Sequence, residues 1–84
     1  MKPIRLTKHA QKQATERGAT EVEVKEAIRK GAREPAKHER QLSRYNFAYG
    51  KKWQNKLYAV KQVAPLIKEE SREIVVITVY TFYY

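Results

Sequence analysis

Hydrophobic and polar positions follow a helical period in the first third of the chain and a strand period afterwards. The helical part predicts a first helix over residues 8–17, with Thr7 as its N-cap. Thr20 with Glu23 three residues later matches a capping box, which predicts a second helix that ends near Lys30. Both helices are short and weakly apolar, so we expect each to pack against a sheet.

After Pro35 the period changes to two, and three strands are predicted. The first covers residues 42–49, where polar and aromatic positions alternate. The second covers residues 56–64 and ends before Pro65, because proline cannot occupy a central ladder position. Residues 73–82 give the strongest strand prediction, since they are β-branched or aromatic and apolar on both faces at their start, as is typical of a central strand.

This order, α-α-β-β-β, predicts one α+β domain over residues 1–84, with two N-terminal helices packed on one face of a three- to four-stranded antiparallel sheet. The other face of the sheet is then open. In the last strand the better core set is Val75, Ile77 and Val79. The parity of the middle strand stays undecided. The side chains expected on the open face are Arg44, Asn46, Thr78 and Tyr80, with Lys61 added for one parity of that middle strand.

The chain is strongly basic, with 18 Lys and Arg against 9 acidic residues, all of them glutamates, and a net charge of +9. No acid lies between Arg40 and Lys68. The aromatic residues interleaved with the basic residues of this stretch are Tyr45, Phe47, Tyr49, Trp53 and Tyr58. Such a surface predicts a polyanion as partner, and RNA in particular. A solubilising surface is the alternative, although solvating charges are normally mixed in sign.

Composition also excludes several classes of protein and site. Without cysteine there are no disulfides, thiolate metal sites or cysteine nucleophiles, and we expect a cytoplasmic protein. The N-terminus lacks a signal-peptide core, and the longest proline-free apolar run, Ile74–Ile77, is too short for a bilayer, so no membrane partner is expected. The two histidines lie 29 residues apart and there is no aspartate, so neither a metal site nor a cofactor is expected.

Two segments carry a resemblance to a known family. Residues 6–28, LTKHAQKQATERGATEVEVKEAI, resemble the N-terminal signature T-x-H-A-x-x-R-x-x-E-R-G of a bacterial and archaeal family of uncharacterised domains, with Gln13 in place of its first arginine. Residues 76–80, VITVY, match the V-T-V-Y of its closing strand. That family is similar to the RelE and BrnT toxins, within the barnase/EndoU/colicin/RelE group of ribonucleases.

The resemblance implies a RelE-like, metal-independent endoribonuclease that cleaves RNA by attack of the ribose 2′-OH, as the toxin of a toxin–antitoxin pair. The partners implied are RNA, free or on the ribosome, and an acidic antitoxin. A non-catalytic RNA- or ribosome-binding module on the same scaffold is the alternative, and a DNA-binding protein ranks below both. If the strand over residues 74–82 lay at a sheet edge, a partner or a homodimer would have to cover it.

Candidate catalytic residues follow from side-chain chemistry. Histidine is a side chain suited to general acid–base work, so His9 is a candidate for it. Arg44 can bind phosphate through its guanidinium fork, and Tyr80 can act as an acid or stack on a base. The residues predicted to contact RNA are Arg5, Lys12, Arg17, Lys51, Lys52, Trp53, Lys56, Lys61 and Thr78. Each has an ordinary structural alternative: Arg17 can pack with its head paired to a glutamate, and Trp53 can cover the core.

Overall fold

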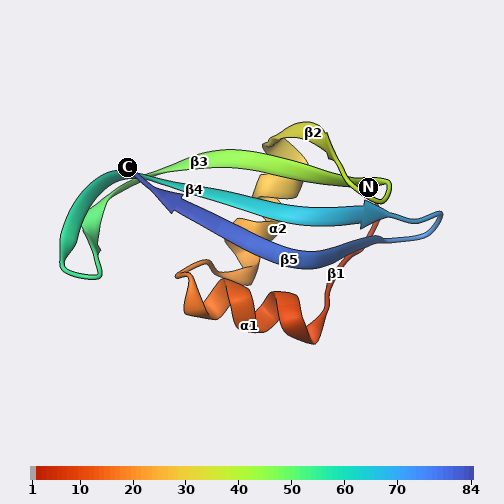
Figure 1. The fold of residues 1–84 in the computed structure, drawn as a ribbon, viewed down its shortest axis with the longest axis horizontal. Coiled ribbons are helices and arrows are strands. Elements are labelled where there is room, and N and C mark those ends of the chain that lie inside the picture. Colours follow the sequence, from red (N-terminus) through yellow and green to blue (C-terminus); the bar gives the residue numbers. More distant parts are fainter. Residues whose placement is uncertain (1) are drawn as a thin grey trace.

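The computed structural model describes residues 2–84 and contains two helices and one five-stranded sheet (Figure 1). The elements in chain order are β1 (Ile4–Leu6), α1 (Lys8–Glu16), α2 (Glu21–Lys30), β2 (Ala32–Ala36), β3 (Arg40–Trp53), β4 (Lys56–Glu69) and β5 (Ile74–Tyr83). The strands lie in the order β1-β5-β4-β3-β2, with β1 parallel to β5 and every other pair antiparallel. The predicted three- to four-stranded antiparallel sheet in the order α-α-β-β-β is therefore wrong.

Two short strands account for this difference. Residues Ile4–Leu6 pair in parallel with Ile74–Val76, and three residues are too few to show a period in the sequence. Residues Ala32–Ala36 form an exposed edge strand that pairs with the start of β3. Pro35 is compatible with this strand because an edge position need not donate a ladder hydrogen bond.

The β3–β4 hairpin is longer than predicted. The sequence suggested that the turn begins at Gly50, but β3 continues to Trp53 and the chain reverses at Gln54 and Asn55, which have φ values of 50° and 67°. Gly50 itself has a φ of 59° and lies where the register between the two strands shifts. It therefore occupies a β-bulge inside the hairpin, a position that favours glycine.

β4 continues through Pro65 to Glu69, so the prediction that this strand ends before the proline is wrong. Pro65 pairs with Val79 of β5, whereas the paired residues of β3 and β4 skip its position. Because proline has no N–H to donate, the ladder is interrupted on the β3 side. Beside this gap the buried hydroxyl of Ser43 donates to the carbonyl oxygen of Ala27 at 2.7 Å, which ties β3 to α2.

β5 contains a second bulge. Ile67 of β4 pairs with Val76, whereas its neighbour Leu66 pairs with Thr78, so that Ile77 has no partner in the ladder. An unpaired residue of this kind reverses the alternation of side chains between the two faces of a strand.

The bulge changes which side chains of β5 reach the core. The hydrophobic core cluster includes Ile74 and Val76 before the bulge and Val79 after it. Of the predicted core set, Val79 belongs to this cluster, Val75 is buried but lies outside the cluster, and Ile77 is only half-buried. The complete cluster consists of Leu6, Ala10, Ala14, Ala19, Val24, Ala27, Ile28, Val63, Ile67, Ile74, Val76 and Val79.

Both helices begin where the sequence predicts. The Thr7 hydroxyl accepts a hydrogen bond from Ala10 N at 3.0 Å, and Thr20 and Glu23 form the complete capping box. Figure 1 shows α2 behind the sheet, whereas α1 runs along β5. Neither helix of the described chain is long and apolar enough to cross a membrane.

Candidate nucleic-acid interface

The face of the sheet that points away from α2, here called the open face, carries a row of exposed aromatic side chains. Tyr80, Phe82 and Tyr84 are 40%, 43% and 56% exposed. They lie two residues apart along β5 and its continuation, where Tyr84 still exchanges backbone hydrogen bonds with Val60. Alternate residues of a strand share a face and lie about 7 Å apart. We call Tyr80, Phe82 and Tyr84 the aromatic row.

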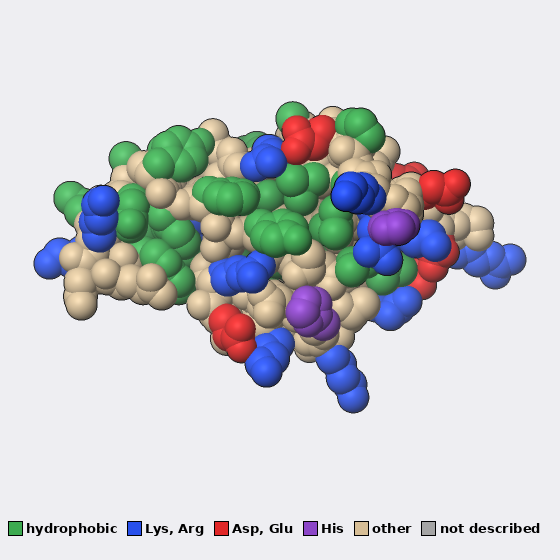
Figure 2. Space-filling model, viewed as in Figure 1, with side chains coloured by type: hydrophobic (Ala, Val, Ile, Leu, Met, Phe, Trp, Pro, Cys, Tyr) green, Lys and Arg blue, Asp and Glu red, His purple; other side chains and the backbone are tan. Residues whose placement is uncertain are grey.

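An arginine lies over each of the first two rings of the aromatic row. The guanidinium carbon of Arg17 is 5.3 Å from the centroid of Tyr80, and that of Arg44 is 5.5 Å from the centroid of Phe82. Arg17 follows α1 and Arg44 belongs to β3, so residues far apart in sequence converge here. Figure 2 shows hydrophobic side chains gathered over the middle of this face, with Lys and Arg at several points on their border.

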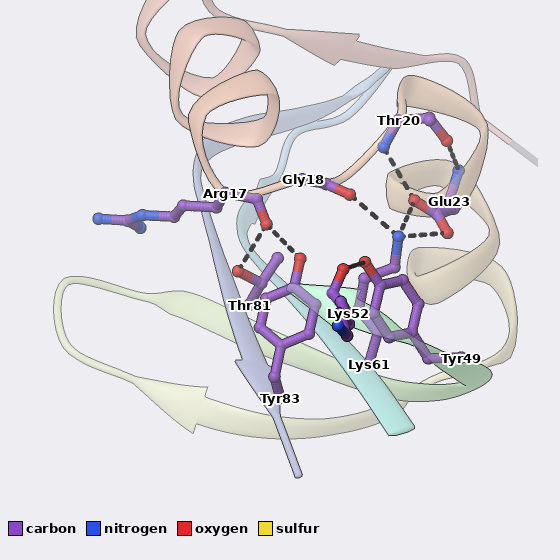
Figure 3. A network of polar contacts seen from close by, with 9 residues as sticks. All are labelled: Arg17, Gly18, Thr20, Glu23, Tyr49, Lys52, Lys61, Thr81 and Tyr83. Carbon is purple, nitrogen blue, oxygen red and sulfur yellow. Dashed lines mark hydrogen bonds and ion pairs between the residues drawn. The ribbon is translucent and has the colours of Figure 1, made fainter. Parts of the chain in front are cut away.

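Hydrogen bonds to β5 hold both the side chain and the main chain of Arg17 in place. Its guanidinium Nη1 donates to the carbonyl oxygen of Val79 at 2.7 Å. Its own carbonyl oxygen accepts from the hydroxyls of Thr81 at 3.0 Å and Tyr83 at 2.6 Å (Figure 3). Burial raises the pKa of the Tyr83 phenol. Arg17 is thus fixed to the sheet at its main chain and at its head group.

His9 and Thr78 meet at the other end of α1. The imidazole Nε2 lies 3.3 Å from the Thr78 hydroxyl, within hydrogen-bonding range, and the imidazole is exposed. Thr78, in contrast, is 9% exposed. Because Thr78 shares its face of β5 with Tyr80, His9 reaches the same side of the sheet as Arg17. The structure thus brings His9, Thr78, Arg17 and Tyr80 to one border of the open face.

A chain of polar contacts that joins β2, β3 and β4 crosses the open face. The Arg44 guanidinium donates through Nε to Glu34 Oε1 at 3.1 Å and through Nη1 to Gln62 Oε1 at 3.0 Å. The Gln62 amide then donates from Nε2 to Asn46 Oδ1 at 2.8 Å. We call this chain, Glu34–Arg44–Gln62–Asn46, the polar relay. Arg44 is therefore held by two partners before any ligand is bound.

Three of the predicted RNA contacts lie elsewhere. Lys61 is 6% exposed on the helix-facing side of β4, bound to Glu23 and to the carbonyl oxygen of Gly18 (Figure 3). Trp53 stacks on Tyr83, with ring centroids 4.8 Å apart and an interplanar angle of 12°.

Arg5 lies on β1. It makes two hydrogen bonds to Glu73, at 3.1 and 3.0 Å. These bonds and the guanidinium charge hold the pKa of the Glu73 carboxyl below its ordinary value.

The remaining predicted cations are exposed and peripheral. Lys51, Lys52 and Lys56 lie near the end of the β3–β4 hairpin, where Lys51 is 5.9 Å from the Tyr49 ring centroid and Lys56 is 5.7 Å from that of Tyr58. Lys12 is on α1, with its ammonium nitrogen 4.0 Å from a carboxylate oxygen of Glu16. These lysines can contribute to long-range attraction of a polyanion but do not converge on one point.

Sequence reasoning did not assign Phe82, Tyr84 or Gln62 to the site. The alternation along the last predicted strand places Phe82 on the same face as Tyr80. The sequence pattern therefore indicated two of the three side chains of the aromatic row. Gln62 could not be assigned because the parity of the middle strand was undecided.

Within residues 2–84, no three or more His, Cys, Asp or Glu side chains are grouped so that they could hold a metal ion. A family model described as a domain of unknown function, DUF4258, matches residues 6–81. Searches of curated proteins and of solved structures find no significant match.

Proposed function

We propose that this chain, which belongs to the DUF4258 family of domains of unknown function, binds single-stranded RNA through its open face. The observation that supports this most directly is the aromatic row with Arg17 and Arg44 over its rings. Bases stack on exposed aromatic side chains of sheets, and guanidinium groups bind the phosphates between them. The net charge of +9 adds a long-range attraction to the nucleic acid.

Binding of a labelled ten-nucleotide oligouridine, measured by fluorescence anisotropy, tests this proposal. Stacking on an aromatic side chain contributes about 1–3 kcal/mol per base, so Phe82→Ala is expected to weaken binding by about 5-fold to 150-fold. Val22→Ala, which removes an apolar side chain that is 75% exposed on α2, is the matched control and leaves binding unchanged. If Phe82→Ala binds as tightly as the wild type, RNA does not lie on the open face.

A second candidate activity is cleavage of the bound RNA, which would make the chain a metal-independent endoribonuclease. It is favoured by the position of His9, whose imidazole lies beside Thr78 at the border that also carries Arg17 and Tyr80. In this reaction the imidazole accepts the proton of a ribose 2′-OH, and the 2′-oxygen forms a bond to the adjacent phosphorus. The bond from phosphorus to the 5′-oxygen breaks, and that oxygen takes a proton from the Tyr80 phenol.

The products of this step are a 2′,3′-cyclic phosphate and a 5′-hydroxyl end. The developing phosphorane carries extra negative charge, which Arg17 is placed to stabilise because its guanidinium is already fixed to Val79. Arg44 is placed farther along the open face, over Phe82, where its guanidinium would bind a neighbouring phosphate.

Incubation of a structured RNA with the purified protein in EDTA tests for cleavage. We expect metal-independent cleavage by the wild type, and its loss in His9→Ala and Tyr80→Phe with RNA binding retained in both variants. Arg29→Ala removes an exposed cation from α2 and serves as the matched charge control. Binding without cleavage by the wild type would leave the non-catalytic RNA- or ribosome-binding module as the function.

The similarity of the α1 segment to RelE and BrnT relatives supports a further part of this proposal, namely a cytoplasmic toxin held in check by an acidic antitoxin. The basic surface is complementary to such a partner. Expression of the chain alone is then expected to arrest growth, and co-expression of a short acidic protein encoded beside it is expected to relieve the arrest. Normal growth on expression of the active wild-type chain would contradict the toxin assignment.

A further inference from the structure

The orientation of every amide in the polar relay follows from the chemistry of Arg44. A guanidinium group has hydrogen-bond donors and no acceptor, so the Gln62 atom that faces it must be the amide oxygen. The Gln62 nitrogen therefore points the other way, toward Asn46, and the Asn46 atom that receives it must also be an oxygen. Glu34 fixes the start of the relay by binding the Arg44 Nε.

The end of the polar relay is a donor that faces solvent. With Oδ1 of Asn46 engaged by Gln62, the Asn46 Nδ2 group is turned outward, and Asn46 is exposed on the open face. Asn46 pairs with Gln62, and Gln62 pairs with Phe82, so the three residues form one row across β3, β4 and β5. Arg44 covers part of the Phe82 ring, which is still 43% exposed. Because neighbouring strands lie about 4.8 Å apart, a base beside Asn46 can contact both the Asn46 amide and the part of the Phe82 ring that Arg44 leaves uncovered.

We propose that this row is a base-specific subsite, and that Asn46 selects a base with a carbonyl oxygen, uracil or guanine, over one with an exocyclic amino group, cytosine or adenine. Uracil presents an acceptor at position 4, where cytosine presents an N–H donor, and guanine and adenine differ in the same way at position 6. A donor such as Asn46 Nδ2 forms a hydrogen bond with the carbonyl oxygen of uracil or guanine, whereas it faces another donor in cytosine or adenine. The inference rests on the proposed binding of RNA to the open face and adds the kind of base that this face accepts.

On the β3 side of this row a small side chain leaves space for a base. Ala48 lies two positions from Asn46 and is exposed, whereas Ala64, two positions from Gln62 on β4, is fully buried. The stem of Arg44 crosses toward Phe82, where its guanidinium can bind the phosphate of the same nucleotide. One arginine thus links phosphate binding to the orientation of the base-reading amide.

Oligouridine and oligocytidine of ten nucleotides provide a matched pair of ligands, because both are pyrimidine strands and differ at position 4. We expect the wild type to bind oligouridine about 2-fold to 10-fold more tightly than oligocytidine, the range set by one hydrogen bond. Asn46→Ala removes the donor and brings this ratio to one, with binding of both strands retained.

Gln62→Glu tests the polar relay itself. A carboxylate accepts from both Arg44 and Asn46, so Asn46 turns its nitrogen toward Glu at position 62 and its oxygen toward the base. The preference should then change to oligocytidine. Gln54→Glu introduces the same charge in the exposed hairpin turn and is the control: it lowers affinity for both strands equally and leaves the ratio as in the wild type.

The outcomes separate this inference from the proposed function. Equal binding of the two strands by the wild type, or a preference for oligocytidine, overturns the base selection while RNA binding stands. A Gln62→Glu protein that is folded by circular dichroism and still prefers oligouridine overturns the polar relay as its cause. If neither strand binds the wild type, the proposed function fails and the base selection fails with it.

Discussion

Lys61 is a buried cation, and its removal is the sharpest test of how the helices are joined to the sheet. Its ammonium group contacts both carboxylate oxygens of Glu23 at 2.8 Å and donates to the Gly18 carbonyl oxygen at 2.9 Å (Figure 3). One lysine of β4 thereby holds the turn between the helices and the capping-box residue of α2. Lys61→Met keeps the aliphatic stem and removes the charge and the donors.

The cost of Lys61→Met can be bounded from this geometry. Removing one partner of a buried ion pair costs about 3–5 kcal/mol, because the other charge is left without compensation. The Glu23 side chain is 22% exposed and still accepts a hydrogen bond from Thr20 N, so part of its solvation is recovered. We therefore expect a loss of about 2–3 kcal/mol in the free energy of unfolding. For a chain of this size that lowers Tm by about 10–20 °C.

The pH dependence gives this prediction a second readout. Burial raises the pKa of Glu23, but the hydrogen bonds from Lys61 and Thr20 outweigh it, so the pKa in the folded protein lies below the ordinary value of 4.5. The stability contributed by this carboxylate is complete above pH 4.5 and is lost as the pH falls through the lower folded value. The difference in the free energy of unfolding between the wild type and Lys61→Met should therefore become smaller at acidic pH.

Urea unfolding followed by circular dichroism at pH 7 and near pH 3.5 measures both effects. Lys56→Met, on an exposed position of the same strand, is the control and should match the wild type. The double variant Lys61→Met/Glu23→Gln should recover part of the loss, since it leaves no uncompensated carboxylate. A Lys61→Met protein as stable as the wild type at pH 7, or a gap of equal size at both pH values, would refute the reasoning.

Three further substitutions test other local contacts. Thr20→Ala removes the N-cap of α2 and should lower the free energy of unfolding by about 1 kcal/mol in urea titrations, whereas an unchanged midpoint would show that the cap contributes nothing. Gly18→Ala adds a Cβ to a residue with a φ of 79°, and that Cβ would lie 2.6 Å from Trp53 Cζ3. We therefore expect the free energy of unfolding to fall by about 2 kcal/mol or more and the fluorescence emission of Trp53, the single tryptophan, to change. Unchanged emission and stability would contradict the close approach. Arg5→Ala should leave Tm unchanged, because the ion pair between Arg5 and Glu73 is exposed. In an NMR titration the same substitution should return the pKa of Glu73 toward its ordinary value, and a Glu73 pKa that is the same in both proteins would refute the pairing.

The parts of the fold that could be predicted are those determined by neighbouring residues. A capping box needs only Thr20 and Glu23, three positions apart, and it was found at its predicted place. The long strands have enough residues for the period of two to appear. β1 and β2 were missed because Ile4–Leu6 is stabilised by a partner 70 residues away, and Ala32–Ala36 is an exposed edge segment without a hydrophobic pattern.

The side chains on the open face were predicted in part, again where the pattern of neighbouring residues determines them. Arg44, Asn46, Thr78 and Tyr80 lie on it as expected, because within one uninterrupted stretch the alternation of a strand assigns the faces correctly. The bulge at Ile77 could not be predicted, since it depends on how β4 and β5 align. The inward position of Lys61 could not be assigned because the parity of the middle strand was undecided. Its burial depends on contacts with Glu23 and with the Gly18 carbonyl oxygen, which the sequence does not show.

The position of α1 explains how helical residues come to take part in a site on the side of the sheet opposite α2. β1 pairs with β5 for only three residues, so the rest of that edge is left for the helix that follows. Arg17 fills part of it, with its side chain bound to Val79 O and its carbonyl oxygen bound by Thr81 and Tyr83. A helix packed flat beneath the sheet could present its side chains to one face alone. A helix at the edge reaches both, and the shortness of β1 is therefore what allows Arg17 to contact the aromatic row and His9 to contact Thr78 beside it.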